Sequence, residues 1–181
     1  MTLNRAFFDR DVVEIARDLI GADLSVDDVG GLIVETEAYK IDDPAAHSFS
    51  GPTRRNNSMF GRPGHAYVYR SYGLHWCLNI VCQTGCAVLL RALEPKSGIE
   101  LMMERRQTQK LHFLCAGPGR LTQSLGVSSR HDGVDILALP FNLSLGTPGE
   151  IDIGRRIGIS KAKDHPWWFG TKNSPFLSRK F

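Results

Sequence analysis

Apolar residues recur along this chain with two different periods, which separate the expected helices from the expected strands. Between Asp11 and Gly21 the apolar positions are spaced as on one face of a helix, at Val12, Ile15, Ala16 and Leu19. An acidic residue begins this segment and a glycine follows it, as is typical of helix ends. The pattern predicts an amphipathic helix over residues 11–20 that supports the core.

Shorter apolar runs separated by turn residues predict the strands. Residues 24–26 and 32–39 are two predicted strands joined by the turn Asp27-Asp28-Val29-Gly30-Gly31. Three more runs, at residues 65–71, 75–83 and 86–94, are separated by short turns that contain glycine, and Pro95 bounds the last run. This series predicts an antiparallel meander. Residues 42–64 form a long polar loop, and loops of more than about a dozen residues in a compact domain are usually functional or mobile.

Two further helices are predicted after the meander. One covers residues 98–106, and the other follows Gly117-Pro118-Gly119 and ends at Gly126. The glycines before the second helix either leave backbone amides free for a phosphate or form a simple turn, and the motif alone leaves both alternatives open. From residue 151 onward the tail mixes short apolar patches with aromatic residues.

Composition and charge restrict the class of protein. The chain has 181 residues, of which 42% are hydrophobic and 23% charged, so one soluble globular domain with a substantial core is expected. No apolar run approaches the ~20 residues that span a bilayer, and Met1 to Arg5 lack the apolar core of a signal peptide. We therefore expect an intracellular protein that does not enter a membrane.

Basic residues occur in doublets along a chain whose net charge is only +3. Several doublets on one face would fit phosphate contacts, although solvated surface doublets are common. They lie at residues 54–55, 105–106, 155–156 and 179–180.

Metal-binding patterns are weak in this sequence. The four cysteines, Cys77, Cys82, Cys86 and Cys115, contain no Cys-x-x-Cys pair, so buried free thiols are the better interpretation. A metal-dependent hydrolase is a further alternative, built on the acids and histidines between residues 42 and 75. These residues lack a helical His-x-x-x-His pair or any other ligand spacing, so no metal site is predicted.

Candidate chemistry begins in the predicted strand 32–39. In an extended strand Glu35, Glu37 and Tyr39 share one face, which places two carboxylates beside an aromatic ring. An edge strand of a half-solvated sheet would show the same alternation. In the meander, Tyr67 and Tyr69 face the same way, and Tyr72 lies beside Gly73 at the expected tip of a hairpin. Tyr72 either folds back onto the core or projects as a wedge between base pairs.

Together these segments resemble the alkyladenine (3-methyladenine) DNA glycosylase family from about Phe7 to Ser178. The resemblance consists of ordered motifs rather than composition. The motifs are Ala16-Arg17-Asp18-Leu19-Ile20-Gly21, Ile33-Val34-Glu35-Thr36-Glu37-Ala38-Tyr39, Ala45-Ala46-His47-Ser48, Arg55-Asn56 with Met59-Phe60, Tyr67-Val68-Tyr69 with Tyr72-Gly73, Cys77-Leu78-Asn79-Ile80, Val88-Leu89-Leu90-Arg91-Ala92-Leu93-Glu94-Pro95, Gly117-Pro118-Gly119-Arg120-Leu121 and Arg156-Ile157-Gly158-Ile159.

The resemblance implies a fold and a set of site residues. The fold would be a single α+β domain over residues 1–181, with a curved antiparallel sheet, a protruding β-hairpin and peripheral helices. Glu37 would deprotonate the attacking water, which Arg91 and the backbone carbonyl of Ile157 would hold. The wall of the pocket that stacks on the flipped base would consist of Tyr39, His47 and Tyr69. The intercalating residue would be Tyr72, and Asn79 would lie near the minor-groove edge of the purine.

The implied activity is that of a monofunctional DNA glycosylase of base excision repair. It would act without metal or cofactor, as a monomer on double-stranded DNA that contains a damaged purine. An alkylated purine is cationic, which improves it as a leaving group and strengthens its stacking on aromatic rings. Neutral hypoxanthine lacks this help and would need protonation as it leaves, for which the sequence offers no unambiguous acid. No lysine lies in the pocket motifs, so no lyase step is expected. The alternative is a non-catalytic nucleic-acid-binding module of the same fold.

Overall fold

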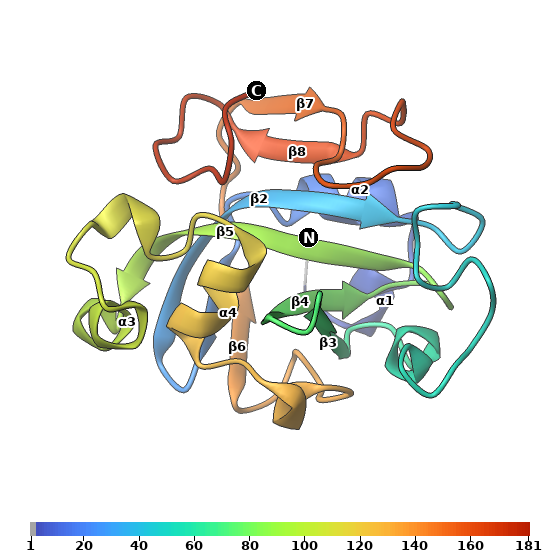
Figure 1. Ribbon diagram of the computed structural model, residues 1–181, viewed down its shortest axis with the longest axis horizontal. Coiled ribbons are helices and arrows are strands. Elements are labelled where there is room, and N and C mark those ends of the chain that lie inside the picture. The colour runs from blue at the N-terminus through green and yellow to red at the C-terminus, as the bar shows by residue number, and fades with distance from the viewer. Residues whose placement is uncertain (1–2) are drawn as a thin grey trace.

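Two long antiparallel strands, β2 (Val29–Tyr39) and β5 (Ala87–Ser97), form the centre of the molecule in the computed structural model, which describes residues 3–181. Met1 and Thr2, part of the N-terminus in which no signal peptide is expected, lie outside the described residues. The other strands are β1 (Asp23–Val26), β3 (Ala66–Ser71), β4 (His75–Val81), β6 (Phe141–Ser144), β7 (Ile151–Gly154) and β8 (Trp168–Thr171). All eight belong to one antiparallel sheet that curls around the core (Figure 1).

Short helices surround this sheet, so the fold is α+β as predicted (Figure 1). The α-helices are α1 (Arg5–Phe8), α2 (Val12–Asp18), α3 (Ile99–Arg106) and α4 (Pro118–Leu125), and the 3₁₀ helices are η1 (Asn57–Phe60), η2 (Leu111–Phe113) and η3 (Ser129–His131). Asp11 caps α2 by accepting a hydrogen bond from the Val13 amide, which confirms the predicted helix start. Among residues 3–181, no helix has both the length and the apolar character to cross a membrane.

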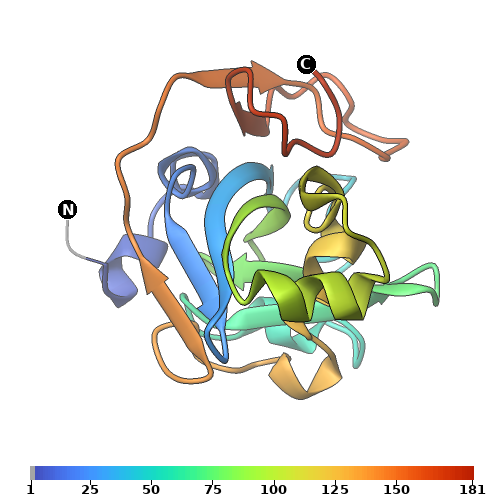
Figure 2. The ribbon, with the colours of Figure 1, turned by 90° about the vertical axis from the view of Figure 1, so that its left-hand side faces the viewer.

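The sheet order explains why β2 can hold a buried site. The order runs β3-β4-β5-β2-β1-β6, and β8 pairs with both β2 and β7. Residues Glu35 to Glu37 of β2 therefore pair with β5 on one side and with β8 on the other. This part of β2 lies inside the sheet, which rules out the edge-strand interpretation of the Glu-x-Glu pattern. The predicted meander β3-β4-β5 is confirmed, and its first hairpin protrudes from the body in Figure 2.

Two predicted strand ends are wrong, and both errors concern residues that usually interrupt strands. Gly30 and Gly31 lie inside β2 rather than in the turn. Both positions require glycine, because a Cβ atom would lie 2.1 Å from the Leu24 carbonyl oxygen at Gly30 and 2.0 Å from the Glu94 carbonyl oxygen at Gly31. Pro95 lies inside β5 instead of bounding it. It pairs with Gly31 next to a register shift, an irregularity at which the missing N–H of proline is tolerated.

Short elements account for the remaining differences. Helix α4 begins at Pro118, the position where a helix needs no N–H, so Gly119 lies within the helix rather than before it. Leu121 and Leu125 are buried, as predicted. The pattern analysis did not predict α1, β6, β7 or β8, which span only four residues each. Four residues are too few for a period to emerge, and their positions are set by pairing with distant strands.

A small apolar cluster beneath β3 and β5 is separate from the main core. It consists of Ala46, Met59, Tyr67, Val81 and Ala87, with the partly buried rings of Tyr39, Phe60 and Tyr69 packed against it. The long loop 42–64 thus contributes two residues to this cluster and is fastened to the sheet. The Ser48 hydroxyl donates to the Gly85 carbonyl over 2.6 Å, and the Asn56 amide donates to the His47 carbonyl over 2.8 Å.

Candidate active site

A cavity of about 840 Å³ opens where the protruding hairpin, β2, β5, the loop 42–64 and residues 157–161 meet. Seven of the eight predicted site residues line it, namely Tyr39, His47, Tyr69, Tyr72, Asn79, Arg91 and Ile157. The eighth, Glu37, is fully buried directly behind this lining. The structure therefore brings together residues that span more than a hundred positions of the sequence.

Three groups hold the carboxylate of Glu37. The Ile157 amide donates to Oε1 over 2.6 Å, the Tyr39 hydroxyl donates to Oε2 over 2.8 Å, and Arg91 Nη1 lies 3.3 Å from Oε1. Burial raises the pKa of Glu37, and these contacts only partly oppose that effect. A carboxylate that is buried, oriented and more basic than usual is well suited to take a proton from water.

Ile157 contacts Glu37 through its N–H, a contact that the resemblance does not imply. The resemblance implies that its carbonyl holds the water, whereas the structure shows its N–H bound to the Glu37 carboxylate. The two groups point in different directions from one residue, so the role of the carbonyl stays a prediction.

Arg91 links Glu37 to a second buried carboxylate. Its Nε donates to Glu35 over 2.8 Å, and its Nη2 donates to the Ser178 hydroxyl over 3.2 Å. Burial alone would lower the pKa of Arg91, but attraction to Glu37 and Glu35 outweighs it, so the net pKa is raised. The guanidinium therefore stays charged.

Aromatic rings form the wall of the cavity. The His47 ring lies edge-on to Tyr69 at a centroid distance of 4.5 Å, and Tyr69 lies 5.4 Å from Tyr67. His47 Nδ1 is hydrogen-bonded to the Tyr67 hydroxyl over 2.9 Å. Burial and the nearby Arg55 lower the pKa of His47, so the imidazole is neutral at pH 7. The aromatic part of the lining therefore carries no positive charge of its own.

Arg156 backs this wall from outside the cavity. Its guanidinium lies over the Tyr39 ring at 4.6 Å and over Trp167 at 5.0 Å. It also pairs with Asp43, and both side chains are completely buried. Arg156 adjoins Ile157 in sequence, so this pair anchors the segment that donates to Glu37.

The basic doublets do not form one DNA-facing surface. Arg156 is buried, and Arg105 and Arg106 donate to the carbonyls of Ser124 and Leu114, which ties α3 to neighbouring segments. Arg55 donates to the Arg70 carbonyl. The exposed members of the predicted set with no hydrogen bond or ion pair to another described residue are Arg54, Arg179 and Lys180, while the exposed Arg155 pairs with Asp164. The doublet pattern was wrong for Arg156, because sequence alone cannot separate a buried guanidinium from a solvated one.

Tyr72 occupies the tip of the β3–β4 hairpin and does not fold back onto the core. Its side chain is 85% exposed, and Leu74 beside it is 78% exposed. The turn is closed by a hydrogen bond of 2.9 Å from the Leu74 amide to the Ser71 carbonyl. Tyr72 has a φ of 49°, a left-handed conformation that is uncommon for an aromatic residue. The hairpin thus presents a large apolar ring to solvent at the rim of the cavity.

Asn79 lies on β4 and has a structural contact. Its side-chain amide donates to the Tyr67 carbonyl over 3.0 Å, between directly paired residues of β3 and β4. It also lines the cavity, so a role at the edge of the purine stays a prediction beside this observed bond.

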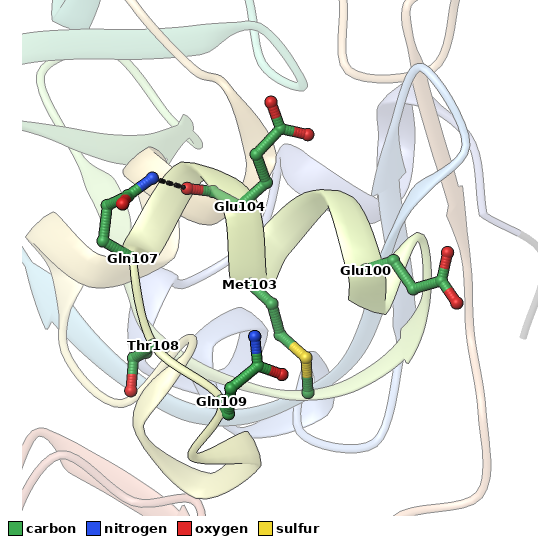
Figure 3. A pocket seen from close by; sticks show the side chains of 6 residues that line it. All are labelled: Glu100, Met103, Glu104, Gln107, Thr108 and Gln109. Atoms are coloured by element: carbon green, nitrogen blue, oxygen red, sulfur yellow. Dashed lines mark hydrogen bonds between the residues drawn. The ribbon is translucent and has the colours of Figure 1, made fainter.

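A second hollow lies beside α3 and contains none of the predicted site residues. Its volume is about 580 Å³, and Figure 3 shows its lining of Glu100, Met103, Glu104, Gln107, Thr108 and Gln109. Within residues 3–181, no three His, Cys, Asp or Glu side chains lie close enough together to hold a metal ion. The four cysteines are free and buried, as predicted, and burial raises the pKa of the Cys115 thiol to about 11.

Comparison with known proteins identifies the family of this chain. Residues 6–175 match the family model of methylpurine-DNA glycosylase. The chain belongs to the methylpurine-DNA glycosylase family. Two relatives carry the name "Putative 3-methyladenine DNA glycosylase". The one from Agrobacterium fabrum is 55% identical over 98% of this chain and 92% of its own length, and the one from Rhizobium meliloti is 53% identical over 100% of this chain and 98% of its own length. The relative from Nitrosospira multiformis is 56% identical over 96% of this chain and 92% of its own length. Membership of a DNA glycosylase family associates the chain with DNA repair.

Sequence reasoning gave no role to several residues of this candidate site. Glu35, to which the resemblance gives no role, binds the arginine that contacts Glu37. In the sequence, Asp43 belongs only to the acids of the metal-site alternative, and Ser178 only marks the end of the segment that resembles the family. Alternation did place Glu35 on one face with Glu37, but it gave Glu35 no function. Nothing in the sequence indicates that Ser178 reaches β2 from the far end of the chain, or that Asp43, in the loop directly after β2, pairs with the distant Arg156.

Proposed function

We propose that this chain is a monofunctional DNA glycosylase that excises alkylated purines such as 3-methyladenine from double-stranded DNA. The observation that carries the proposal is the buried Glu37 carboxylate, held by three donors behind an aromatic cavity whose rim presents Tyr72. We further propose that it acts as a monomer, without metal or cofactor, inside the cell where the DNA is.

In the proposed reaction Glu37 takes a proton from water while the water oxygen attacks C1′ of the deoxyribose. The N-glycosidic bond breaks, and its electron pair leaves with the purine. A purine alkylated on a ring nitrogen is cationic before cleavage, so it departs neutral and needs no acid. Positive charge that develops on the sugar is stabilised by the nearby carboxylate. The products are a free base and an abasic site.

The proposed binding step flips the damaged nucleotide into the cavity. Flipping costs a few kcal/mol of unstacking and unpairing, least where the base is damaged or mispaired. The exposed Tyr72 ring would fill the vacated space in the duplex, and the wall of Tyr39, His47 and Tyr69 would stack on the base. Deaminated purines such as hypoxanthine would enter the same cavity but leave more slowly, because they are neutral.

The decisive experiment is a single-turnover excision assay on a duplex that contains one alkylated purine. Excision should continue in saturating chelator, and borohydride should trap no covalent protein–DNA adduct, because water is the proposed nucleophile. Absence of excision with intact lesion binding would favour the non-catalytic binding module. A chelator-sensitive rate or a trapped adduct would contradict the proposed mechanism.

Tyr72→Ala is expected to weaken excision more for a well-paired lesion than for the same lesion opposite a mismatch. The wedge offsets the cost of unpairing, which the mismatch has already removed. Leu145→Ala, a partly buried position against the main core, provides a control for general loss of packing. The measurement is the ratio of single-turnover rates on the two duplexes. Equal losses on both would show that Tyr72 is not a wedge.

Asn79→Ser is expected to raise excision of undamaged guanine relative to hypoxanthine. If the Asn79 amide blocks the exocyclic amine of guanine, the smaller serine removes the clash, and the ratio should rise by roughly tenfold to a hundredfold. The assay compares single-turnover rates on matched duplexes. A ratio that stays at the wild-type value in a folded variant would leave Asn79 with only its bond to the Tyr67 carbonyl.

A further inference from the structure

The C-terminal segment reaches the catalytic residues through one buried carboxylate. Glu35 is completely buried on β2, and four donors surround its two oxygens. Oε1 accepts from Arg91 Nε over 2.8 Å, from Trp168 Nε1 over 2.9 Å and from the Ser178 hydroxyl over 2.6 Å. Oε2 accepts from the Ser178 amide over 2.5 Å. Two of the four bonds thus come from a single residue near the C-terminus.

Ser178 also contacts the arginine directly. Arg91 Nη2 donates to the Ser178 hydroxyl over 3.2 Å, while Arg91 Nε binds Glu35. Two of the three guanidinium nitrogens are therefore held, one by Ser178 and one by the carboxylate that Ser178 binds. The third, Nη1, is left facing Glu37 at 3.3 Å. A planar guanidinium fixed at two nitrogens cannot rotate, so the direction of the third is determined.

An aromatic stack fastens the segment that contains Ser178. Phe181 stacks on Trp168 with ring centroids 3.7 Å apart and an angle of 5° between the planes. Gly154 on β7 and Gly170 on β8 make room for this ring, since a Cβ on Gly170 would lie 2.4 Å from it. Because Trp168 also donates to Glu35, the stack and the hydrogen bonds support the same carboxylate.

We propose that Ser178 and Glu35 are positioning residues that hold the Arg91 guanidinium with Nη1 directed at Glu37. The inference rests on the proposed function, because it assigns the C-terminal segment a part in base excision. Neither residue lines the cavity, so both act through Arg91 rather than on the DNA.

Loss of this clamp has a defined electrostatic consequence. The charged and titratable groups that face Glu37 are Arg91 on β5, Glu35 and Tyr39 on β2, Tyr69 on β3 and Cys77 on β4. Among them Arg91 is the group whose charge favours the ionised carboxylate. If Arg91 moves away, the pKa of Glu37 rises further, and more of the enzyme carries a protonated, inactive Glu37 at a given pH.

Ser178→Ala tests the proposal because it removes the hydroxyl without changing any charge. We expect the single-turnover rate on an alkylated duplex to fall about tenfold, and the acid limb of its pH profile to move to higher pH. Ser178→Thr, which keeps the hydroxyl, should restore both. Ser174→Ala is the matched control, because that hydroxyl lies in the same segment and accepts only from the local Phe176 amide.

The outcomes separate three possibilities. If the wild-type protein does not excise the base, the proposed function fails, and carboxyl ¹³C titration of Glu37 still tests the clamp, with a higher pKa expected in Ser178→Ala. If Ser178→Ala lowers the melting temperature but leaves the acid limb and the Glu37 titration at their wild-type positions, the residue is structural and the inference is overturned. Equal effects of Ser178→Ala and Ser174→Ala would also overturn it.

Discussion

Glu37→Gln is expected to lower the single-turnover rate of base excision by about a thousandfold or more. The substitution preserves the size of the side chain but removes both the base that accepts the proton of water and the negative charge beside the developing sugar cation. The Ile157 amide can still donate to the Gln oxygen, so the cavity should keep its shape. The measurement is the rate on a lesion duplex with enzyme in excess.

Binding of the lesion duplex should survive this substitution, because Glu37 lies behind the cavity wall and does not line it. Glu94→Gln is a suitable control, since Glu94 lies on the neighbouring strand β5 but pairs with Lys96 at the surface. Its excision rate should match that of the wild type. An undiminished rate in Glu37→Gln would remove Glu37 from the mechanism and direct attention to Glu35.

The same substitution is also expected to change how stability depends on pH. Because burial raises the pKa of Glu37 in the folded state, the folded protein binds this proton more tightly than the unfolded chain. Glu37 therefore costs the wild type stability as the pH rises from below the unfolded pKa through the folded one. The free energy of unfolding of Glu37→Gln, relative to that of the wild type, should therefore increase as the pH rises through this window. A constant difference would contradict the raised pKa.

Local patterns were sufficient for most of the regular parts of this fold. Helices α2 and α4 carry apolar positions at helical spacing, and the strands of the meander are apolar runs bounded by turns, whereas α3 buries only Met102 and is marked mainly by the residues around it. The four-residue strands of the tail are too short to show a period. Among them β8 contributes most to the site, because it pairs with β2 and its Trp168 donates a hydrogen bond to Glu35. Its position depends on pairing with a strand more than 130 residues earlier, which no local pattern encodes.

The candidate site shows the same division between local and distant information. The cavity residues of β2, β3 and β5 follow from strand alternation together with the family motifs, and the cavity gathers them as predicted. The buried partners that orient them do not follow from the sequence. Asp43 lies in a polar loop and resembles a solvated acid, and Arg156 belongs to a doublet that resembles a surface patch. Only the folded chain shows that these two charges meet behind Tyr39.

Asp43→Ala is accordingly expected to destabilise the protein by about 3–5 kcal/mol, because it leaves the buried Arg156 guanidinium without its counter-charge. Arg156 would then be drawn toward water, and the Tyr39 ring and the Ile157 amide would lose their support. Excision should fall together with stability. The measurements are denaturant unfolding and the single-turnover rate at a temperature where the variant remains folded.

Asp164→Ala is the matched control for this buried pair. Asp164 pairs with Arg155, the immediate neighbour of Arg156, but both side chains are largely exposed and the atoms are 3.3 Å apart. Exposed ion pairs contribute little to the free energy of unfolding, so this variant should unfold at the same denaturant concentration as the wild type. The double variant Asp43→Ala with Arg156→Met removes both buried charges and should recover part of the stability that Asp43→Ala loses. If the double variant is less stable than Asp43→Ala by the full cost of a second independent change, Arg156 stabilises the fold through its rings and carbonyl contacts rather than through its charge.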